Sequence, residues 1–284
     1  MQQQGTMCTF DGNDSWVILS PIEQNIKSKI EAVGTPLKDW DIRINYGIKT
    51  GCNEAFIIST EKRNEILSNC NTEEERKRTA ELIRPILRGR DIKRYSYNWA
   101  GLWLINTHNG VHGKMPRVDI NDYPAIKQHL DNYLDKISIR ADKGDTPYNL
   151  RNCAYLEDLS QPKIVWIELS DEPKFAISEL MPLNTVFYLI GERIYDIVGM
   201  LNSTIYKWYF THCIGTTSGV GTNRWLKYTI EQVPLIKHHI EISHITEKIV
   251  NYEISEEFGQ LEIDEILFNI LELTNDEIDV IKNY

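Results

Sequence analysis

The feature that most constrains the fold is a series of short strand-like runs in the middle of the chain. The runs are Ile164–Leu169, Phe175–Ile177 and Val186–Ile190, and all three are rich in β-branched and aromatic residues. Pro, Asp and Gly bound them, which is typical of strands separated by turns. Asp39–Ile44, Ala55–Ile58 and Leu102–Ile105 are further strand candidates, and a polar loop over Gly47–Asn53 joins the first two. These runs predict a region of mixed or antiparallel sheet between residues 39 and 190.

Helical patterns interrupt and follow this region. Apolar residues recur at helical spacing over Ile22–Val33, and Ile197, Leu201, Ile205 and Trp208 predict one helix over residues 194–210. The capping box Thr72-x-x-Glu75 opens a charged helix that Pro85 ends, and Pro124 stands near the first turn of another. A flexible loop is expected over residues 215–223, and a capping box at Thr274-x-x-Glu277 marks a helix near the C-terminus.

Together these patterns predict an α+β fold, in which a mixed or antiparallel sheet region with inserted helices is followed by a helical C-terminal segment. We divide the chain into a linker-like start over residues 1–20, a main domain over residues 21–236 and an acidic helical segment over residues 237–284. A chain of 284 residues is long enough for one large domain or two smaller ones.

Composition narrows the class of protein. Hydrophobic residues make up 42% of the chain and charged residues 25%, as in ordinary globular proteins. No apolar run approaches the roughly 20 residues that span a bilayer, and Met1–Thr6 has neither the cationic nor the apolar part of a secretory signal. The five cysteines are scattered without a Cys-x-x-Cys pair, which indicates free thiols in a reducing cytoplasm and no structural zinc site. We therefore expect a cytoplasmic protein without a membrane partner.

The net charge of −10 is unevenly distributed. Residues 231–284 hold 13 acidic and 3 basic residues, whereas residues 1–230 hold 28 of each. Within that neutral part, Arg76–Arg94 carries eight bases against two acids. A local basic strip can attract a polyanion whatever the global charge, so the overall acidity does not exclude nucleic acid.

Motifs for familiar chemistry are absent from the sequence. There is no Asn/Asp-Pro-Pro-Tyr motif for methylating an extruded base, and Thr146-Pro147-Tyr148-Asn149 echoes it only superficially. There is no Gly-Lys-Ser/Thr phosphate loop, and Gly219-Val220-Gly221 lacks the strand and helix that a cofactor-binding glycine motif needs. His108 and His112 have zinc-pair spacing, but Asn109-Gly110 between them breaks a helix. Cys153 has no neighbouring cue for an activating base, so we predict no catalytic residue and no metal site.

One enzymatic alternative stays open. A metal-dependent nuclease brings carboxylates and a lysine to one metal, commonly as Asp…Glu-x-Lys, and Asp158, Glu172 and Lys174 have these identities in this order. Pro173 cannot donate a hydrogen bond to a sheet, so a turn between strands fits the last two better than a catalytic strand does.

Four loop-like basic segments carry side chains suited to contacting DNA: residues 49–53, residues 88–94, residues 140–144 together with Arg151, and residues 223–227. Lys and Arg bind phosphates, whereas Arg, Lys, Asn and Thr also read base edges. Each segment alone fits a solvated loop, but four of them on one neutral body favour a nucleic-acid partner. The candidate DNA-binding residues are Lys49, Thr50, Asn53, Arg88, Arg90, Lys93, Arg94, Lys143, Arg151 and Arg224.

A family resemblance rests on an ordered series of motifs. Tyr46-Gly47-Ile48-Lys49-Thr50-Gly51-Cys52-Asn53 and Ile83-Arg84-Pro85-Ile86-Leu87-Arg88-Gly89-Arg90-Asp91 resemble the TaqI-like C-terminal target-recognition domain of adenine-specific type II restriction-modification enzymes. The resemblance covers about residues 15–284 and continues through Asp142–Tyr155, Pro162–Trp166, Leu201–Ser203, Ile230–Leu235 and Ile263–Ile278.

The resemblance implies a division of labour. In this family an upstream Rossmann-like methyltransferase domain binds S-adenosylmethionine and methylates an exocyclic adenine amine, many members add a nuclease domain, and the C-terminal region reads an asymmetric DNA site. It implies that residues 21–236 are a DNA target-recognition domain whose partners are double-stranded DNA and the upstream methyltransferase domain of the same polypeptide. S-adenosylmethionine, and a divalent metal where a nuclease is present, are then expected in domains outside this chain, which needs no cofactor itself.

Two alternatives to that reading remain. The chain could be a freestanding specificity subunit that recruits a separate methyltransferase, or a self-contained nuclease using the carboxylates named above. The linker-like start of the chain favours a fragment of a larger enzyme over a freestanding subunit. So does its C-terminal sequence, which is similar to that of the restriction-modification enzymes.

Overall fold

A four-stranded antiparallel sheet forms the centre of the molecule. The computed structural model describes residues 19–217, 222–237 and 239–284. The central sheet has the order β2-β9-β6-β7, built from β2 (Ile42–Tyr46), β9 (Val186–Gly191), β6 (Lys163–Ile167) and β7 (Ala176–Ser178). Every neighbouring pair is antiparallel, with Tyr46 opposite Phe187 and Ile167 opposite Val186.

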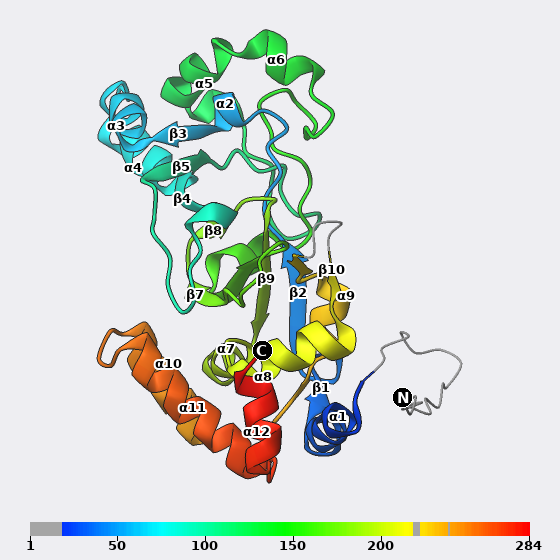
Figure 1. Ribbon diagram of the computed structural model, residues 1–284. Helices are drawn as coiled ribbons and strands as arrows, with labels where there is room; N and C mark the ends of the chain where they lie inside the picture. The colour runs from blue at the N-terminus through cyan, green and yellow to red at the C-terminus, as the bar shows by residue number, and fades with distance from the viewer. Residues whose placement is uncertain (1–18, 218–221, 238) are drawn as a thin grey trace.

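Each face of the central sheet belongs to a different hydrophobic core. Ile164, Trp166 and Leu189 pack into one core, whereas Val165 and Tyr188 pack into the other. Successive side chains of a strand point to opposite faces, so a run with apolar residues at every position is buried on both sides. The sheet therefore separates two lobes, which Figure 1 shows above and below it.

The first lobe, which we call the α/β lobe, contains a second sheet with the order β3-β5-β4-β8. Its strands are β3 (Ile57–Ser59), β5 (Leu102–Ile105), β4 (Ile83–Leu87) and β8 (Met181–Pro182). Only the β4–β8 pair is parallel. The helices of this lobe are α2 (Asn53–Phe56), α3 (Thr60–Ser68), α4 (Glu73–Leu82), α5 (Pro124–Asp131) and α6 (Leu134–Ile139).

The second lobe, the helical lobe, combines both ends of the described chain. Its helices are α1 (Pro21–Val33), α7 (Ile194–Leu201), α8 (Thr204–Tyr209), α9 (Lys227–Ile230), α10 (Ile240–Val250), α11 (Glu256–Ile270) and α12 (Asn275–Lys282). Two short pairs accompany them: β1 (Thr35–Pro36) with β12 (Pro234–Leu235), and β10 (Thr216–Thr217) with β11 (Asn223–Arg224). Among the described helices none is long and apolar enough to cross a membrane.

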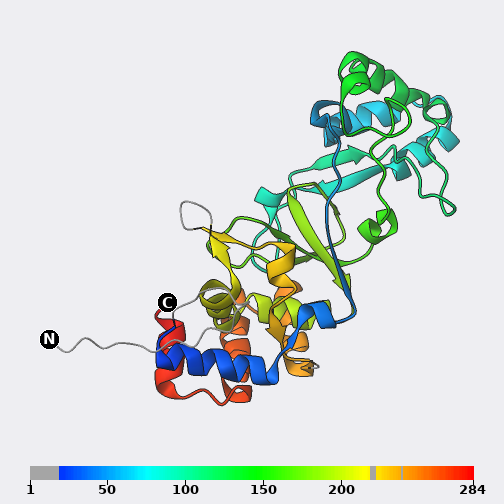
Figure 2. The same cartoon turned by 90° about the vertical axis from the view of Figure 1, so that its right-hand side faces the viewer.

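The path of the chain makes the α/β lobe an insertion into the helical lobe. The chain starts in α1, leaves through β2, builds the α/β lobe and returns through β9, as Figure 2 also shows. Asn25 and Lys29 on α1 then contact Glu277 on α12, with Nδ2–Oε1 at 2.5 Å and Nζ–Oε2 at 2.8 Å. The first and last described helices therefore close one core together.

The predicted α+β class, with mixed and antiparallel sheets and a helical C-terminal segment, is confirmed. Strands at residues 102–105, 163–167, 176–178 and 186–191 and helices at residues 21–33 and 73–82 lie close to their predicted positions. The predicted helix start at Pro124 and both capping-box helices are also present. Residues 1–18 of the predicted linker-like start lie outside the described residues.

The prediction of one helix over residues 194–210 was wrong, because the chain breaks at Asn202 and Ser203. The Asn202 side chain accepts from Phe175 N (3.1 Å) and donates to Phe175 O (2.9 Å). The Ser203 hydroxyl caps α8 by accepting from Tyr206 N at 3.3 Å. Hydrogen bonds to a distant segment thus end α7, and a local cap starts α8.

Smaller differences concern the first loops. Ala55 and Phe56 lie in α2 instead of a strand, because their amides donate to the Cys52 carbonyl, and β3 begins only at Ile57. Pro85 lies within β4, while the preceding helix already ends at Leu82. Residues 216–217 and 223–224 form a short hairpin within the loop predicted over residues 215–223, and residues 218–221 are outside the described residues.

The predicted boundary near residue 237 does not separate two hydrophobic cores, because residues on both sides of it belong to one core. Ile242, Ile263 and Leu267 from beyond this position share a core with Ile26 and Ile30 from α1. The acidic C-terminal helices therefore supply part of the core of the helical lobe.

Candidate nucleic-acid interface

The connection between β8 and β9, residues Leu183–Thr185, brings two of the predicted basic segments together. Leu183 N donates to Leu87 O at 3.0 Å, and Asn184 N donates to Ile48 O at 3.0 Å. Ile48 bridges to Leu183 in parallel, and β4 is also parallel to β8. Strands that run in the same direction end at the same edge, so the residues that follow, Lys49 and Arg88, emerge on either side of this connection.

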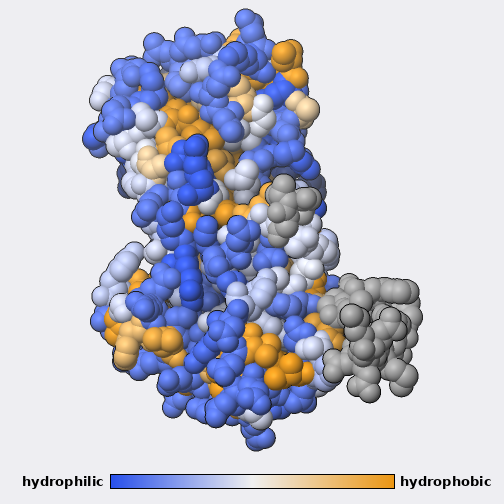
Figure 3. Space-filling model, viewed as in Figure 1, coloured by the Kyte–Doolittle hydropathy of each residue, from blue (hydrophilic) through white to orange (hydrophobic). Residues whose placement is uncertain are grey.

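The third segment, around Arg224, lies beside the second. Gly89 is buried so closely against β6 that an added Cβ would lie 2.8 Å from Ile167 Cγ2 and 3.4 Å from Thr185 O. Glu168, the residue after Ile167, accepts from Arg224 Nε at 3.0 Å. The turn at Gly89 and the β10–β11 hairpin are thereby placed next to each other. Figure 3 shows one face of the molecule, and the surface between the two lobes is mostly hydrophilic on that face.

Arg88 shapes its own turn. Its guanidinium makes two hydrogen bonds to the buried carboxylate of Asp91, Nε–Oδ2 at 2.8 Å and Nη2–Oδ1 at 2.7 Å. These bonds close the 3-10 turn η2 (Gly89–Asp91), and the hydrogen bond to Asp91 raises the pKa of Arg88. Arg90, on the outside of the turn, is exposed and has no ion-pair partner among the residues that the structure describes.

The rest of the basic run turns toward the helical lobe. Tyr95 has a φ of 60°, its amide donates to Phe175 O at 2.9 Å, and its hydroxyl bonds the Gln260 side chain on α11. Arg94 lies 3.6 Å from a carboxylate oxygen of Glu256, whereas Lys93 is exposed. The basic run therefore does not form one extended segment, because it is divided between a tight turn and a contact with α11.

The other predicted residues lie in a loop cluster formed by residues 47–53, 106–118 and 140–156. Lys49 Nζ and Arg151 Nη1 each lie 3.3 Å from a carboxylate oxygen of Asp142, and both side chains are about half exposed. One carboxylate between two cations leaves a local charge of +1. Lys143 Nζ donates to Ser138 O at 2.5 Å and keeps its charge exposed.

Thr50 and Asn53 have a local structural role. Thr50 is buried, its hydroxyl donates to Asn53 Oδ1 at 2.6 Å, and it accepts from Cys52 N at 3.2 Å. Asn53 remains exposed, but its carbonyl oxygen is engaged by Thr50. Of the predicted pair, the structure leaves only Asn53 at the surface.

Arg140, which belongs to one of the predicted basic segments but is not among the candidate DNA-binding residues, is buried and joins two of these loops. Arg140 donates to the carbonyls of Thr50, Asp142, Pro147 and Asn149, with 2.8 Å to Asp142 O and 3.1 Å to Pro147 O. Its guanidinium also lies 4.4 Å from the centre of the Phe56 ring, a cation–π distance. Burial lowers the pKa of Arg140 to about 10, which leaves it charged at neutral pH.

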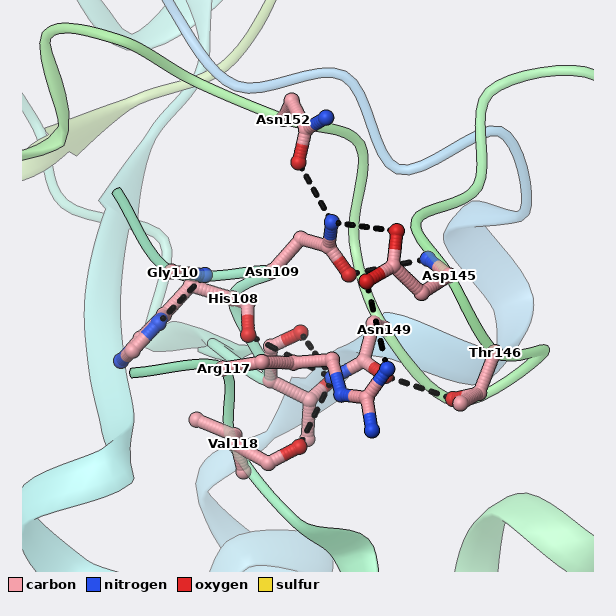
Figure 4. Close-up of polar contacts among 10 residues, drawn as sticks. His108, Asn109, Gly110, Arg117, Val118, Asp145, Thr146, Asn149 and Asn152 are labelled. Atoms are coloured by element: carbon pink, nitrogen blue, oxygen red, sulfur yellow. Dashed lines mark hydrogen bonds and ion pairs between the residues drawn. The ribbon is translucent and has the colours of Figure 1, made fainter. Parts of the chain in front are cut away.

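Amide side chains join the remaining loops, as Figure 4 shows. Buried Asn149 donates to Val118 O at 2.9 Å and accepts from the Thr146 hydroxyl at 2.6 Å. Asn109 accepts from Asp145 N at 2.9 Å and donates to the Asp145 carboxylate at 3.0 Å. The loop cluster is therefore a hydrogen-bonded unit whose exposed side chains are held on a fixed backbone.

Two polar residues at the centre of the arrangement were missed by the sequence reasoning. Asn184 and Thr185 are exposed on the connection that the chain holds between Ile48 and Leu87. Both side chains can donate and accept hydrogen bonds. In the sequence, Asn184 and Thr185 are only a polar pair between two strands. Their position next to the basic segments follows from the pairing of β4 with β8, which requires the fold.

The structure gives no support to a metal-dependent nuclease. Asp158 accepts from Arg43 Nη2 at 3.0 Å, while Glu172 accepts from Lys207 Nζ at 2.7 Å, so each carboxylate has its own cation. The described residues contain no group of three or more His, Cys, Asp or Glu side chains that could hold a metal. His108 Nδ1 accepts from Gly110 N at 3.2 Å, and burial lowers the pKa of His108 and raises that of Cys153.

Comparison with solved structures finds similar folds in restriction-modification enzymes. The structure titled as the type IIL restriction-modification enzyme MmeI in complex with DNA aligns with a TM-score of 0.57 at 12% identity, covering 86% of this chain and 35% of that one. The type IIG restriction endonuclease BpuSI aligns with a TM-score of 0.49 at 12% identity, covering 88% and 32%. This chain thus spans about a third of the length of each.

The sequence itself identifies the family. No curated protein matches the chain. Residues 84–235, more than half of the sequence, match the family described as the TaqI-like C-terminal specificity domain. That range includes the turn at Arg88–Arg94, most of the loop cluster and the hairpin at Arg224. The chain therefore belongs to the TaqI-like C-terminal specificity domain family.

Proposed function

We propose that this chain binds double-stranded DNA and reads a target sequence, as the specificity region of a restriction-modification enzyme. The observation that carries the proposal is the family match over residues 84–235, which spans three of the four basic segments. The arrangement of the basic segments beside Leu183–Thr185 supports it, because exposed cations flank a hydrogen-bonded connection whose Asn184 and Thr185 side chains are exposed.

The side chains divide into two roles. Arg90 and Lys93, exposed and without carboxylate partners in the described part of the chain, are suited to bind phosphates, and Lys49 and Arg151 supply a further net charge of +1. Asn184 and Thr185 are suited to read base edges in the major groove, where all four base pairs differ in their donors and acceptors. Arg88 has a supporting role, since Asp91 neutralises it.

The proposal assigns the chemistry to other domains. Methylation of an exocyclic adenine amine with S-adenosylmethionine, and any metal-dependent cleavage, would belong to a catalytic part joined upstream in the same polypeptide and working in the cytoplasm. The length agrees with this assignment, since the chain covers 35% of the MmeI structure that it resembles.

The test is binding of fluorescently labelled random-sequence duplex DNA across a salt series. The double variant Arg90→Ala/Lys93→Ala should weaken binding and make the slope of log K against log salt shallower by about 1 to 2, since each lost phosphate contact removes about 0.9. The control is Lys282→Ala, an exposed lysine on α12 outside the basic strip, which should bind like the natural chain.

Equal losses in the double variant and the control would overturn the assignment of these two residues. Absence of duplex binding by the natural chain at low salt would overturn the proposed function itself. Selection of bound sequences from the random pool then tests the reading role, because Asn184→Ala should change the selected sequence while leaving the salt slope unchanged.

A further inference from the structure

A pocket opens in the loop cluster next to the proposed interface. It has a volume of about 230 Å³ and is lined by Tyr46–Lys49, Asn106, His108–Gly110 and Leu150–Leu156. Its wall includes Ile48, whose carbonyl accepts from Asn184 N, so the pocket and the proposed base-reading residues lie on either side of one backbone hydrogen bond. Pockets for drug-sized ligands are roughly 300–1,000 Å³, so this one suits a single small ring system.

The apolar part of the pocket includes two aromatic rings, those of Tyr46 and Tyr155. Tyr46 and Tyr155 meet edge to face with their ring centres 6.4 Å apart, and Tyr155 packs in turn against Tyr188 at 6.3 Å. Tyr188 is buried, whereas Tyr46 keeps 45% of its surface exposed. A fixed aromatic ring with an open face is the platform on which proteins stack unpaired bases.

One of the residues that line the pocket, Asn106, has an unsatisfied side-chain acceptor. The side-chain oxygen of Asn106 is buried and has no hydrogen-bond partner in the described part of the chain. An asparagine amide pairs well with a base that presents a donor beside an acceptor, as adenine does with its exocyclic amine and N7. A ligand of this kind would supply the hydrogen bond that the protein does not.

The remaining wall is cationic. Lys49 and Arg151 line the pocket and share the single carboxylate of Asp142, so a net positive charge lies beside the ring site. That charge suits the phosphates that flank a base in a nucleic-acid strand.

We propose that this pocket holds one unpaired base of bound DNA, stacked on Tyr46, hydrogen-bonded by Asn106 and held at its phosphates by Lys49 and Arg151. The inference rests on the proposed function, because it places the pocket at the edge of a DNA interface. A base that has already left the duplex stack enters at lower cost than a paired one, since unstacking costs free energy.

The experiment compares three labelled DNAs of one sequence with the full chain: a fully paired duplex, the same duplex with a single bulged adenine, and the corresponding single strand. The bulged duplex should bind about five- to tenfold more tightly than the paired one. Tyr46→Ala should abolish this preference without weakening the paired duplex, and Tyr46→Phe should keep it. Tyr228→Ala, an exposed tyrosine on α9 outside the pocket, is the matched control.

A second readout reports on the pocket directly. With 2-aminopurine as the bulged base, stacking on Tyr46 should quench its fluorescence on binding, and Tyr46→Ala should restore it. Asn106→Ala should lower the preference for bulged adenine, whereas the Tyr228→Ala control should leave both the preference and the quenching intact.

The outcomes separate the two proposals. A chain that binds no duplex overturns the proposed function. A chain that binds the paired duplex but shows no preference for the bulge, or whose preference survives Tyr46→Ala, overturns the pocket and leaves the proposed function standing. A single strand that binds as tightly as the bulged duplex, with the same loss in Tyr46→Ala, supports the pocket and identifies single-stranded DNA as the source of the base.

Discussion

Arg140 shows how one buried charge can organise a binding surface. Its hydrogen-bond acceptors are backbone carbonyls from two of the three loop segments, including Thr50 and Asn149. Carbonyl dipoles and the Phe56 ring compensate the guanidinium, which makes no hydrogen bond to a carboxylate within the described residues. Lys49 and Arg151 in turn depend on the loop backbone that Arg140 fixes.

Replacing Arg140 by Met should therefore cost more than the loss of a surface charge. We expect the free energy of unfolding to fall by about 2–4 kcal/mol, because several buried carbonyls lose their donor at once. Urea denaturation followed by circular dichroism measures the change. Arg117→Met is the control, since Arg117 is exposed and makes only a surface ion pair with Asp145 at 3.2 Å, worth less than about 1 kcal/mol. Equal effects of the two substitutions would show that Arg140 has no special structural role.

At the scale of secondary-structure elements, the close contact between α7 and α10 depends on a glycine. Gly199 on α7 lies so near α10 that an added Cβ would be 2.3 Å from Thr246 Oγ1 and 2.9 Å from Ile242 Cγ2. Buried Ile242 from α10 packs into the core at this contact. The helical lobe can close only because one helix presents no side chain there.

Gly199→Ala should consequently destabilise the protein even though alanine is the better helix former. Overpacking costs about 1–3 kcal/mol, while the gain in helix propensity is about 1 kcal/mol, so we expect a net loss of up to about 2 kcal/mol. Adding Thr246→Ala should restore part of that loss, because it removes the nearest atom, whose hydroxyl has no partner in the described chain. Thermal unfolding of both variants tests this, and a Gly199→Ala protein as stable as the natural one would contradict it.

Elements with local signals could be predicted from the sequence, whereas those fixed by distant partners could not. Three helices could be predicted from signals that span only a few residues. The Thr-x-x-Glu motifs at Thr72 and Thr274 predicted α4 and α12, and the spacing of apolar residues predicted α1. The break at Asn202 depends on Phe175, which lies 27 residues away, so no periodicity within residues 194–210 could show it.

The same limit applies to the candidate site. The segments rich in Lys and Arg were found from composition, but the partners that neutralise them were not. Asp91 is only three residues from Arg88, so that pair could have been found from its spacing. Glu256 is 162 residues from Arg94, and Asn184 reaches Ile48 only through strand pairing, so both contacts require the fold.

At the scale of the whole molecule, two cores share one sheet, and the last 45 residues complete one of them. Ile263, Leu267 and Phe268 on α11 pack with α1, α7 and α8. Most acidic residues of this segment are exposed, whereas Asp264 and Glu277 are buried and hydrogen-bonded, Asp264 to Thr204 and Glu277 to Asn25 and Lys29.

A chain that stops after Ile236 should therefore fail to fold cooperatively. It would expose the apolar face of α1 and α7, so we expect binding of a hydrophobic dye, loss of a sharp thermal transition and association in size-exclusion chromatography. A chain that stops after Lys282 keeps all three C-terminal helices and should behave like the natural protein. A sharp transition in the shorter chain would instead establish an independent domain boundary near residue 237.

The contact between α1 and α12 also has a consequence for synthesis on the ribosome. Lys29 binds Glu277, so at translation rates of about 5–20 residues per second the first helix waits roughly 10–50 s for its partner. The core of the α/β lobe, drawn from residues 48–190, is complete well before that. During this interval Ile26 and Ile30 lack the part of their core that the C-terminal helices supply, so we expect the nascent chain to carry an incompletely covered apolar helix until α12 has emerged.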